Sequence, residues 1–266
     1  MAVRRKSTRP LSNVRLIDEL NMRMPTDATY DVGIAQSEAE VMALQSLRYS
    51  VFNVEMKEGL SASHIEGLDV DAFDDQCHHL YVRHRDTGIM VGTYRMQTVD
   101  MAQSHNGFYS GTLFDFSAAP RQLIQRGVEI GRACIEFDHR SLKVLYLLWK
   151  GLGVYAAHLD KQYLFGCCSL TGQNEEEGLA VKNYLEKRSR MHPDFEISPL
   201  ESHICCQNLV SDAISKPPRL MRAYLSLGAL ICSPPAIDRK FKTIDFLTVF
   251  DSRTLKRTDL AFYRIA

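Results

Sequence analysis

The order of hydrophobic patterns between residues 30 and 170 constrains the fold more than any other feature of the sequence. Strand-like apolar stretches occupy residues 30–35, 77–84, 89–99, 128–137 and 163–170. Helical spacing of apolar residues occupies 38–53, between the first two strands, and 142–159, between the last two. This order predicts an α/β (α+β) fold with a central mixed, mostly antiparallel sheet flanked by helices.

Local signals support several of these elements. Ser37 and Glu40 form the sequence pattern of a capping box at the start of the first helix. Arg85-Asp86-Thr87-Gly88 is a turn sequence that predicts a hairpin between the second and third strands. Further along, we expect helices at 174–190 and 216–230 and a last strand at 244–250.

The charge balance and the cysteines limit the class of protein. The formal net charge is zero, which gives no general attraction to nucleic acid. No run of about 18 apolar residues is present, so we expect no spanning helix. The 7 cysteines are an odd number and no signal peptide precedes them, which predicts reduced thiols in the cytoplasm.

The first 28 residues form a basic segment with two interpretations. Its cations are Arg4, Arg5, Lys6, Arg9 and Arg15. The segment is either a frayed terminus or an electrostatic arm for an acidic partner. An anionic carrier protein and the anionic inner leaflet of the membrane both qualify as that partner.

Four carboxylates lie within seven residues, at Asp69, Asp71, Asp74 and Asp75. They repel one another and need a cation, a metal or solvent nearby. A calcium loop would need further oxygen ligands and a central glycine, which are absent. The segment is therefore either a solvated acidic loop or a site that attracts an amine or pairs with an arginine.

Charged residues also interrupt two strands. Arg95 lies among apolar neighbours, and so do Glu129 and Arg132. Strand alternation places Glu129 and Arg132 on opposite faces, which predicts two polar networks. Glu129 either pairs with Arg95, as a structural ion pair, or acts as a general base.

Other chemistry has weaker support in the sequence. Cys134 and Cys167-Cys168 lie in apolar strands, where a cysteine usually serves as a small hydrophobic residue. We expect no metal site, because His78 and His79 face opposite sides of a strand and Cys205-Cys206 lacks a second cysteine pair. The turn at 138–141 lacks the glycines that cradle the pyrophosphate of coenzyme A in acetyltransferases.

Several short motifs, in order and with consistent spacing over about residues 30–250, resemble one bacterial family. They are Leu47-Arg48-Tyr49-Ser50-Val51-Phe52, Asp71-Ala72-Phe73-Asp74-Asp75, Val91-Gly92-Thr93-Tyr94-Arg95, Glu129-Ile130-Gly131-Arg132, Leu148-Trp149-Lys150-Gly151-Leu152 and Pro217-Pro218-Arg219-Leu220. These motifs resemble the ornithine-lipid N-acyltransferases, also labelled hemolysin-like GNAT proteins. That family is similar in turn to acyl-homoserine lactone synthases.

The resemblance implies a GNAT-like core at 29–200, after a basic arm at 1–28 and before a C-terminal extension at 201–266 that packs on the core. It implies transfer of a 3-hydroxyacyl group from acyl carrier protein to the α-amine of L-ornithine, which forms lyso-ornithine lipid. No cofactor is implied, and acyl-CoA is the less favoured donor. The implied catalytic residues are Glu129, Arg132 and Arg95, and the implied substrate-binding residues are Arg48, Phe52, Asp69, Asp71 and Asp74.

The implied mechanism is direct attack of the neutral amine on the thioester, with backbone amides near 129–132 holding the oxyanion. A β-bulge there would free those amides. We expect the acyl chain in an apolar cleft lined by the first helix and the loop at 107–116, and a cytoplasmic protein with room for peripheral contact at the inner membrane. Alternatives are the same chemistry on glycine, lysine, glutamine or a lyso-lipid, or a non-catalytic acyl- or lipid-binding protein.

Overall fold

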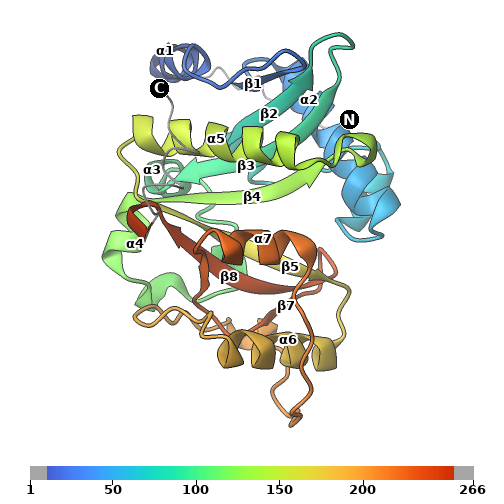
Figure 1. The fold of residues 1–266 in the computed structure, drawn as a ribbon, viewed down its shortest axis with the longest axis vertical. Coiled ribbons are helices and arrows are strands. Elements are labelled where there is room, and N and C mark those ends of the chain that lie inside the picture. The colour runs from blue at the N-terminus through green and yellow to red at the C-terminus, as the bar shows by residue number, and fades with distance from the viewer. Residues whose placement is uncertain (1–10, 255–266) are drawn as a thin grey trace.

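A computed structural model describes residues 11–254 of the chain (Figure 1). The helices are α1 Leu11–Asn21, α2 Glu38–Tyr49, α3 Val99–Gln103, α4 Arg121–Arg126, α5 Leu142–His158, α6 Glu175–Lys187 and α7 Arg219–Ser226. The strands are β1 Tyr30–Ile34, β2 His78–His84, β3 Met90–Thr98, β4 Gly127–Ile135, β5 Tyr163–Thr171, β6 Leu230–Ile231, β7 Ala236–Asp238 and β8 Thr243–Asp251.

The strands form one sheet in the order β1-β2-β3-β4-β5-β8-β6, and β7 also pairs with β8. Every neighbouring pair is antiparallel except β4 and β5. The predicted α/β fold with a mixed, mostly antiparallel sheet is therefore confirmed. In the part of the chain that the structure covers, no helix has the length and apolar character needed to cross a membrane.

The one parallel pair divides the sheet into two halves. β4 and β5 each have nine residues, yet they pair only from Gly127 opposite Tyr163 to Glu129 opposite Phe165. Beyond these pairs the two halves separate toward the carboxyl ends of both strands (Figure 1). Directly after these pairs the two backbones still approach closely, because a Cβ atom at Gly166 would lie 2.0 Å from the Ile130 carbonyl oxygen.

Each half of the sheet has its own hydrophobic core. On the first half, α1 and α5 cover one face of β1–β4. Ile17, Leu20 and Leu148 of these helices are buried in the core that the helices form with the sheet. On the second half, α6 and α7 pack against β5 and β8 through buried residues such as Leu185, Met221 and Phe246. The segment 201–254 thus supplies β8, which lies between β5 and β6, and the covering helix α7. The predicted boundaries at residues 28 and 200 stay predictions.

The predicted starts of most helices and strands are confirmed, but the predictions were wrong at three places. The capping box of Ser37 and Glu40 is present, but the helix predicted to residue 53 is α-helical only to Tyr49 and continues as a π-helix over Ser50–Glu55. The helix predicted at 216–230 spans only Arg219–Ser226, because Pro218 disfavours a helical conformation for the residue before it and is itself the N-cap, with a ψ of 159°.

The third failure concerns the basic segment at 1–28, in which α1 was not predicted. Ile17 and Leu20 of α1 are fully buried against the sheet. Asn21 fixes the helix to β1 through two hydrogen bonds to the backbone of Ile34, of 2.7 and 3.1 Å. Residues 1–10, which carry Arg4, Arg5, Lys6 and Arg9, lie outside the described residues.

Candidate active site

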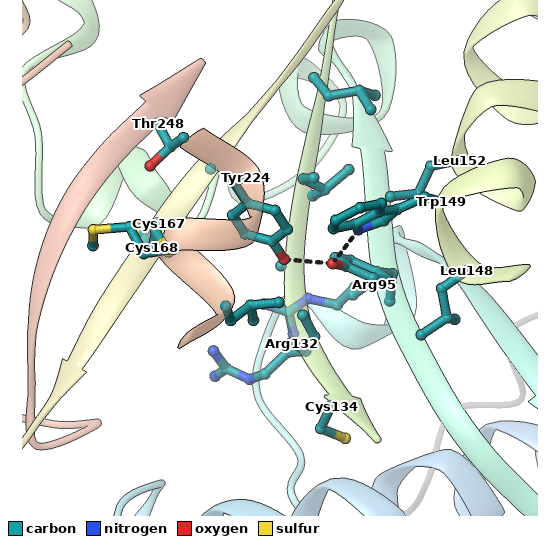
Figure 2. Close-up of a pocket in the computed structure, with 18 of the residues that line it drawn as sticks. Arg95, Arg132, Cys134, Leu148, Trp149, Leu152, Cys167, Cys168, Tyr224 and Thr248 are labelled. Atoms are coloured by element: carbon teal, nitrogen blue, oxygen red, sulfur yellow. Dashed lines mark hydrogen bonds between the residues drawn. The ribbon is translucent and has the colours of Figure 1, made fainter. Parts of the chain in front are cut away.

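A cleft of about 970 Å³ occupies the gap between β4 and β5 (Figure 2). This volume is at the upper end of the ~300–1,000 Å³ that ligand pockets usually have. Its lining includes Arg95 of β3, Glu129 and Arg132 of β4, and Phe52 of the π-helix. The structure thus brings four of the predicted site residues, from three separate segments, to one cleft.

The apolar wall of the cleft agrees only in part with the one that we predicted, since Val51 and Phe52 of the first predicted helix line it. Its residues come mainly from α5 and α7, among them Leu145, Leu148, Leu152, Ala223 and Leu227. Of the loop at 107–116, only Tyr109 lines the cleft. Phe108 and Phe116 turn away because they pack on Phe165, with ring centroids 5.1 and 5.9 Å apart.

Three aromatic side chains join the two halves of the sheet across the cleft. Tyr224 of α7 hydrogen-bonds to the hydroxyl of Tyr94 on β3, and the indole nitrogen of Trp149 on α5 donates to the same hydroxyl at 3.3 Å (Figure 2). All three are at least partly buried. The C-terminal segment is therefore fixed to the first half of the sheet above the gap between β4 and β5.

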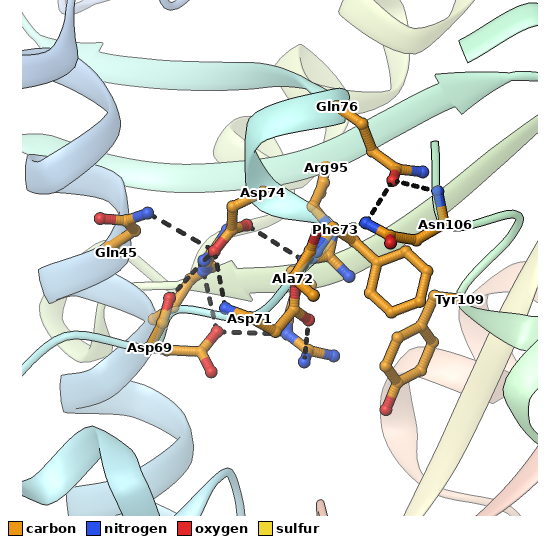
Figure 3. Close-up of polar contacts among 12 residues, drawn as sticks. Gln45, Asp69, Asp71, Ala72, Phe73, Asp74, Gln76, Arg95, Asn106 and Tyr109 are labelled. Carbon is orange, nitrogen blue, oxygen red and sulfur yellow. Dashed lines mark hydrogen bonds and ion pairs between the residues drawn. The ribbon is translucent and has the colours of Figure 1, made fainter. Parts of the chain in front are cut away.

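Behind the cleft, three arginines and three aspartates alternate in a closed ring of ion pairs (Figure 3). Each arginine contacts two aspartates, and each aspartate contacts two arginines, so the six charges cancel. We refer to these residues as the arginine–aspartate ring. The contacts are Arg48–Asp69 at 2.9 Å, Asp69–Arg132 at 3.2 Å, Arg132–Asp71 at 2.7 Å, Asp71–Arg95 at 2.6 Å, Arg95–Asp74 at 3.0 Å and Asp74–Arg48 at 2.8 Å.

The ring changes the interpretation of the acidic segment. Burial alone would raise the pKa of Asp74, but the guanidinium groups of Arg48 and Arg95 outweigh it and hold that pKa far below its usual range. Arg95 and Arg132 lower the pKa of Asp71 in the same way, against the effect of burial. Of the two predicted roles of Asp69, Asp71 and Asp74, pairing with an arginine is confirmed. The attraction of an amine stays a prediction.

A β-bulge in β4 explains why Arg132 joins this ring. Arg95 pairs with Gly131 and Thr93 pairs with Cys134, so β4 has one extra residue between these pairs. Arg132 lies in the bulge with a φ of 51°. The extra residue reverses the alternation, so the prediction that Glu129 and Arg132 serve networks on opposite faces is wrong. Both side chains lie on the face that carries Arg95.

The bulge also places Arg132 between two aromatic rings. Its guanidinium lies 4.8 Å from the ring centroid of Tyr109 and 4.3 Å from that of Phe241. Phe52 packs edge-on against Phe241, with centroids 5.3 Å apart. Arg132 thus combines two ion pairs with two cation–π contacts at the wall of the cleft.

Glu129 has a different environment from the one that we predicted. It forms no ion pair with Arg95 but accepts four hydrogen bonds from neutral groups. They come from the backbone nitrogens of Tyr109 at 3.0 Å and Ser110 at 2.7 Å, the Ser110 hydroxyl, and the Gln97 amide at 2.5 Å. These donors fix the direction of a carboxylate that is 6% exposed and lines the cleft.

Two further carboxylates line the cleft, Glu58 and Asp245, which sequence reasoning did not select. Asp245 lies on β8 and accepts hydrogen bonds from the hydroxyls of Ser169 and Thr243. Burial, with the nearby Asp238 carboxylate, raises the pKa of Asp245 to about 7 despite these bonds. Burial also raises the pKa of Glu58. An aspartate inside the apolar run 244–250 was the signal that could have identified this site.

The thiols near the cleft are unsuited to nucleophilic attack. Burial raises the pKa of Cys134 and of Cys168 to about 12, and that of Cys167 also lies well above its usual value. Among residues 11–254, one group of three potential metal ligands lies together, Glu175, Cys205 and Cys206, with ligand atoms within 4.8 Å of one another. None of the three lines the cleft.

The sequence matches the family described as "Acetyltransferase (GNAT) domain" over residues 47–150. The synthase LasI, an acyl-homoserine lactone synthase of known crystal structure, superimposes with a TM-score of 0.47 at 12% identity, over 85% of this chain and 91% of LasI. The matched domain, together with the curated relatives described next, shows that the protein is an acyltransferase of the GNAT class.

Within that class, curated relatives define the family. The chain is 30% identical to the L-ornithine N(alpha)-acyltransferase of Agrobacterium fabrum over 249 residues, which cover 88% of this chain and 85% of the relative. It is also 30% identical to the L-ornithine N(alpha)-acyltransferase of Rhizobium meliloti, over 89% of this chain and 84% of the relative. The chain belongs to the L-ornithine N(alpha)-acyltransferase family.

Proposed function

We propose that the protein transfers a 3-hydroxyacyl group from acyl carrier protein to the α-amine of L-ornithine and so forms lyso-ornithine lipid. The observation that carries this proposal is the cleft between β4 and β5, which joins a charged end to a long apolar wall. Leu148, Leu152 and Leu227 offer that wall to an acyl chain, and Asp245 offers a carboxylate to an amino acid. The names of the family members make ornithine the first acceptor to test.

In the proposed reaction the neutral α-amine attacks the thioester carbonyl carbon. The new N–C bond forms, the C–S bond breaks, and the amine loses a proton. Glu129 accepts that proton directly or through a water molecule, and the proton passes on to the leaving thiolate. Backbone amides of the bulged strand near Arg132 stabilise the oxyanion of the tetrahedral intermediate.

Four residues of the ring are proposed to position other residues and not to contact the substrates. Arg48, Asp69, Asp71 and Asp74 do not line the cleft, so their proposed role is to hold Arg95 and Arg132 at its wall. Arg95 and Arg132 then face the substrates. Phe52 contributes to the same wall through its contact with Phe241.

The proposed donor is acyl carrier protein rather than coenzyme A. The turn before α5 contains Asp138, His139 and Arg140 and no glycine, and its Arg140 is engaged in an ion pair with Glu55. This turn lacks the exposed glycine amides that a pyrophosphate needs. We propose that the basic N-terminal arm assists the carrier protein and gives the enzyme peripheral contact with the inner face of the cytoplasmic membrane.

A mass-spectrometric competition assay tests the function. Purified protein and 3-hydroxyacyl-carrier protein are mixed with ornithine, lysine, glycine, glutamine and a lyso-lipid, and the reaction is repeated with the acyl-CoA. We expect N-acylornithine as the main product, formed faster from the carrier protein. If another amine is acylated instead, that amine replaces ornithine as the proposed acceptor. If neither donor gives an acylated product, the proposal is wrong.

A further inference from the structure

A second group of carboxylates, separate from the arginine–aspartate ring, lies at the wide end of the cleft. Asp245 is on β8, opposite Ser169 near the carboxyl end of β5, where the two halves of the sheet have separated. Glu58 and Asp245 both line the cleft, with 4% and 2% of their surfaces exposed. We refer to Glu58 and Asp245 as the acidic pair.

Two backbone contacts hold Glu58 in this place. The Glu58 amide donates to the Phe52 carbonyl at 2.8 Å, at the end of the π-helix, and the Gly59 amide donates to the Phe241 carbonyl at 3.0 Å. Gly59 has a φ of 78°, which favours glycine. The hairpin of β7 and β8 and the segment after α2 are thereby joined, so that the acidic pair is rigidly placed.

The hydrogen-bonding of the acidic pair is incomplete. Glu58 Oε1 is buried and has no hydrogen-bond partner among the described residues. Asp245 receives only neutral hydroxyl donors, from Ser169 and Thr243. Within residues 11–254 neither carboxylate forms an ion pair, although the nearby Asp238 adds a third negative charge. Buried carboxylates without cations are costly, so this site is suited to bind one.

We propose that Glu58 and Asp245 form a subsite for the side-chain ammonium of a diamino acid acceptor. This inference rests on the proposed function and adds the residues that select the acceptor. The acidic pair then binds the side-chain ammonium of the amino acid, and the α-amine stays available for acyl transfer.

The test compares ornithine with norvaline, which has the same carbon chain but lacks the side-chain amine. We expect the wild-type enzyme to acylate ornithine with a kcat/KM at least about 10-fold higher than norvaline. Glu58→Gln and Asp245→Asn should each lower kcat/KM for ornithine about 10- to 100-fold, mainly through KM, since a hydrogen bond to a charged group contributes about that much. The same variants should leave norvaline within about 2-fold of wild type.

Direct binding separates failure of this inference from failure of the proposed function. Calorimetric titration with ornithine alone, without donor, should show weaker binding to both variants than to the wild type, whether or not any acyl transfer occurs. Asp86→Asn, at an exposed carboxylate in the β2–β3 turn, is the matched control and should change neither measurement. Circular dichroism confirms that each variant is folded.

Two results would overturn the subsite. One is an unchanged ratio of ornithine to norvaline in both variants, which would show that the acidic pair does not recognise the ammonium. The other is an equal loss of kcat for both acceptors in Asp245→Asn without a change in KM or in ornithine binding, which would assign Asp245 to proton transfer instead.

Discussion

The molecule contains two separate groups of buried carboxylates beside one cleft, and they differ in their partners. In the arginine–aspartate ring, every aspartate contacts two guanidinium groups, and the pKa values of Asp71 and Asp74 are lowered. In the acidic pair, Asp245 and Glu58 meet no cation, and their pKa values are raised. The comparison indicates that the ring stabilises the fold around the cleft and that the acidic pair is available to a ligand.

The largest expected effect comes from breaking the ring. Arg48→Met removes a buried cation and leaves Asp69 and Asp74 with one arginine each. Loss of one partner from a buried ion pair typically costs about 3–5 kcal/mol. We expect a loss of this size in the free energy of unfolding, measured in urea. Arg83→Met removes an exposed cation whose contact with Asp31 is 3.7 Å long, and should cost less than about 1 kcal/mol.

Glu129 belongs to neither group, because neutral donors hold it. Glu129→Gln should lower kcat by about 100-fold or more while the protein stays folded, since a general base usually contributes ~10²–10⁴-fold. Steady-state rates and a thermal unfolding curve check this together. Full activity of the folded variant would remove Glu129 from the role of proton acceptor.

The raised pKa of Asp245 predicts a pH-dependent effect on stability. Between the unfolded-state pKa near 3.9 and the folded-state value of about 7, the folded protein retains a proton that the unfolded chain releases. The wild type should therefore lose stability as pH rises through this range, and Asp245→Asn should lose less. Between pH 5 and pH 8 we expect the stability of the variant to rise relative to that of the wild type by roughly 3 kcal/mol.

Urea denaturation at pH 5 and pH 8 measures this difference. The neighbouring carboxylates Glu58 and Asp238 remain in both proteins, so the comparison isolates the proton on Asp245. If the difference in free energy of unfolding between the variant and the wild type is the same at pH 5 and pH 8, ionisation of Asp245 does not destabilise the folded protein. That result would overturn the prediction.

The smallest expected effect concerns the N-terminal arm. Deletion of residues 2–10 removes Arg4, Arg5, Lys6 and Arg9 but leaves α1, whose Ile17 and Leu20 belong to the core. We expect affinity for acyl carrier protein to fall several-fold at low salt and the difference to vanish at high salt, because exposed charges are screened. Equal affinities at low salt would favour the frayed-terminus interpretation.

The sequence predicts the order of elements because apolar periodicity and caps are local signals. Ser37 and Glu40 fix the start of α2 within their own turn, and the turn at 85–88 fixes the β2–β3 hairpin. The bulge at Arg132 could not be predicted, because it depends on how β4 pairs with β3. Strand alternation had placed Arg132 on the other face, and the one extra residue of the bulge brings its side chain into the ring.

The site shows the same limit. The arginines and aspartates were selected as site residues, but their pairing needs contacts across more than 20 residues of chain, as between Arg48 and Asp69. Glu58 was not selected because nothing next to it in the sequence marks it. Its place in the cleft depends on contacts with Phe52 and with Phe241, the latter from the far end of the chain.

A crystal structure with bound ornithine tests the central comparison most directly. We expect the side-chain ammonium within hydrogen-bonding distance of Asp245 or Glu58, the α-amine pointing toward the bulge of β4, and an undisturbed arginine–aspartate ring. An ammonium bound instead to Asp69, Asp71 or Asp74, with the ring opened to receive it, would show that the ring and not the acidic pair binds the acceptor.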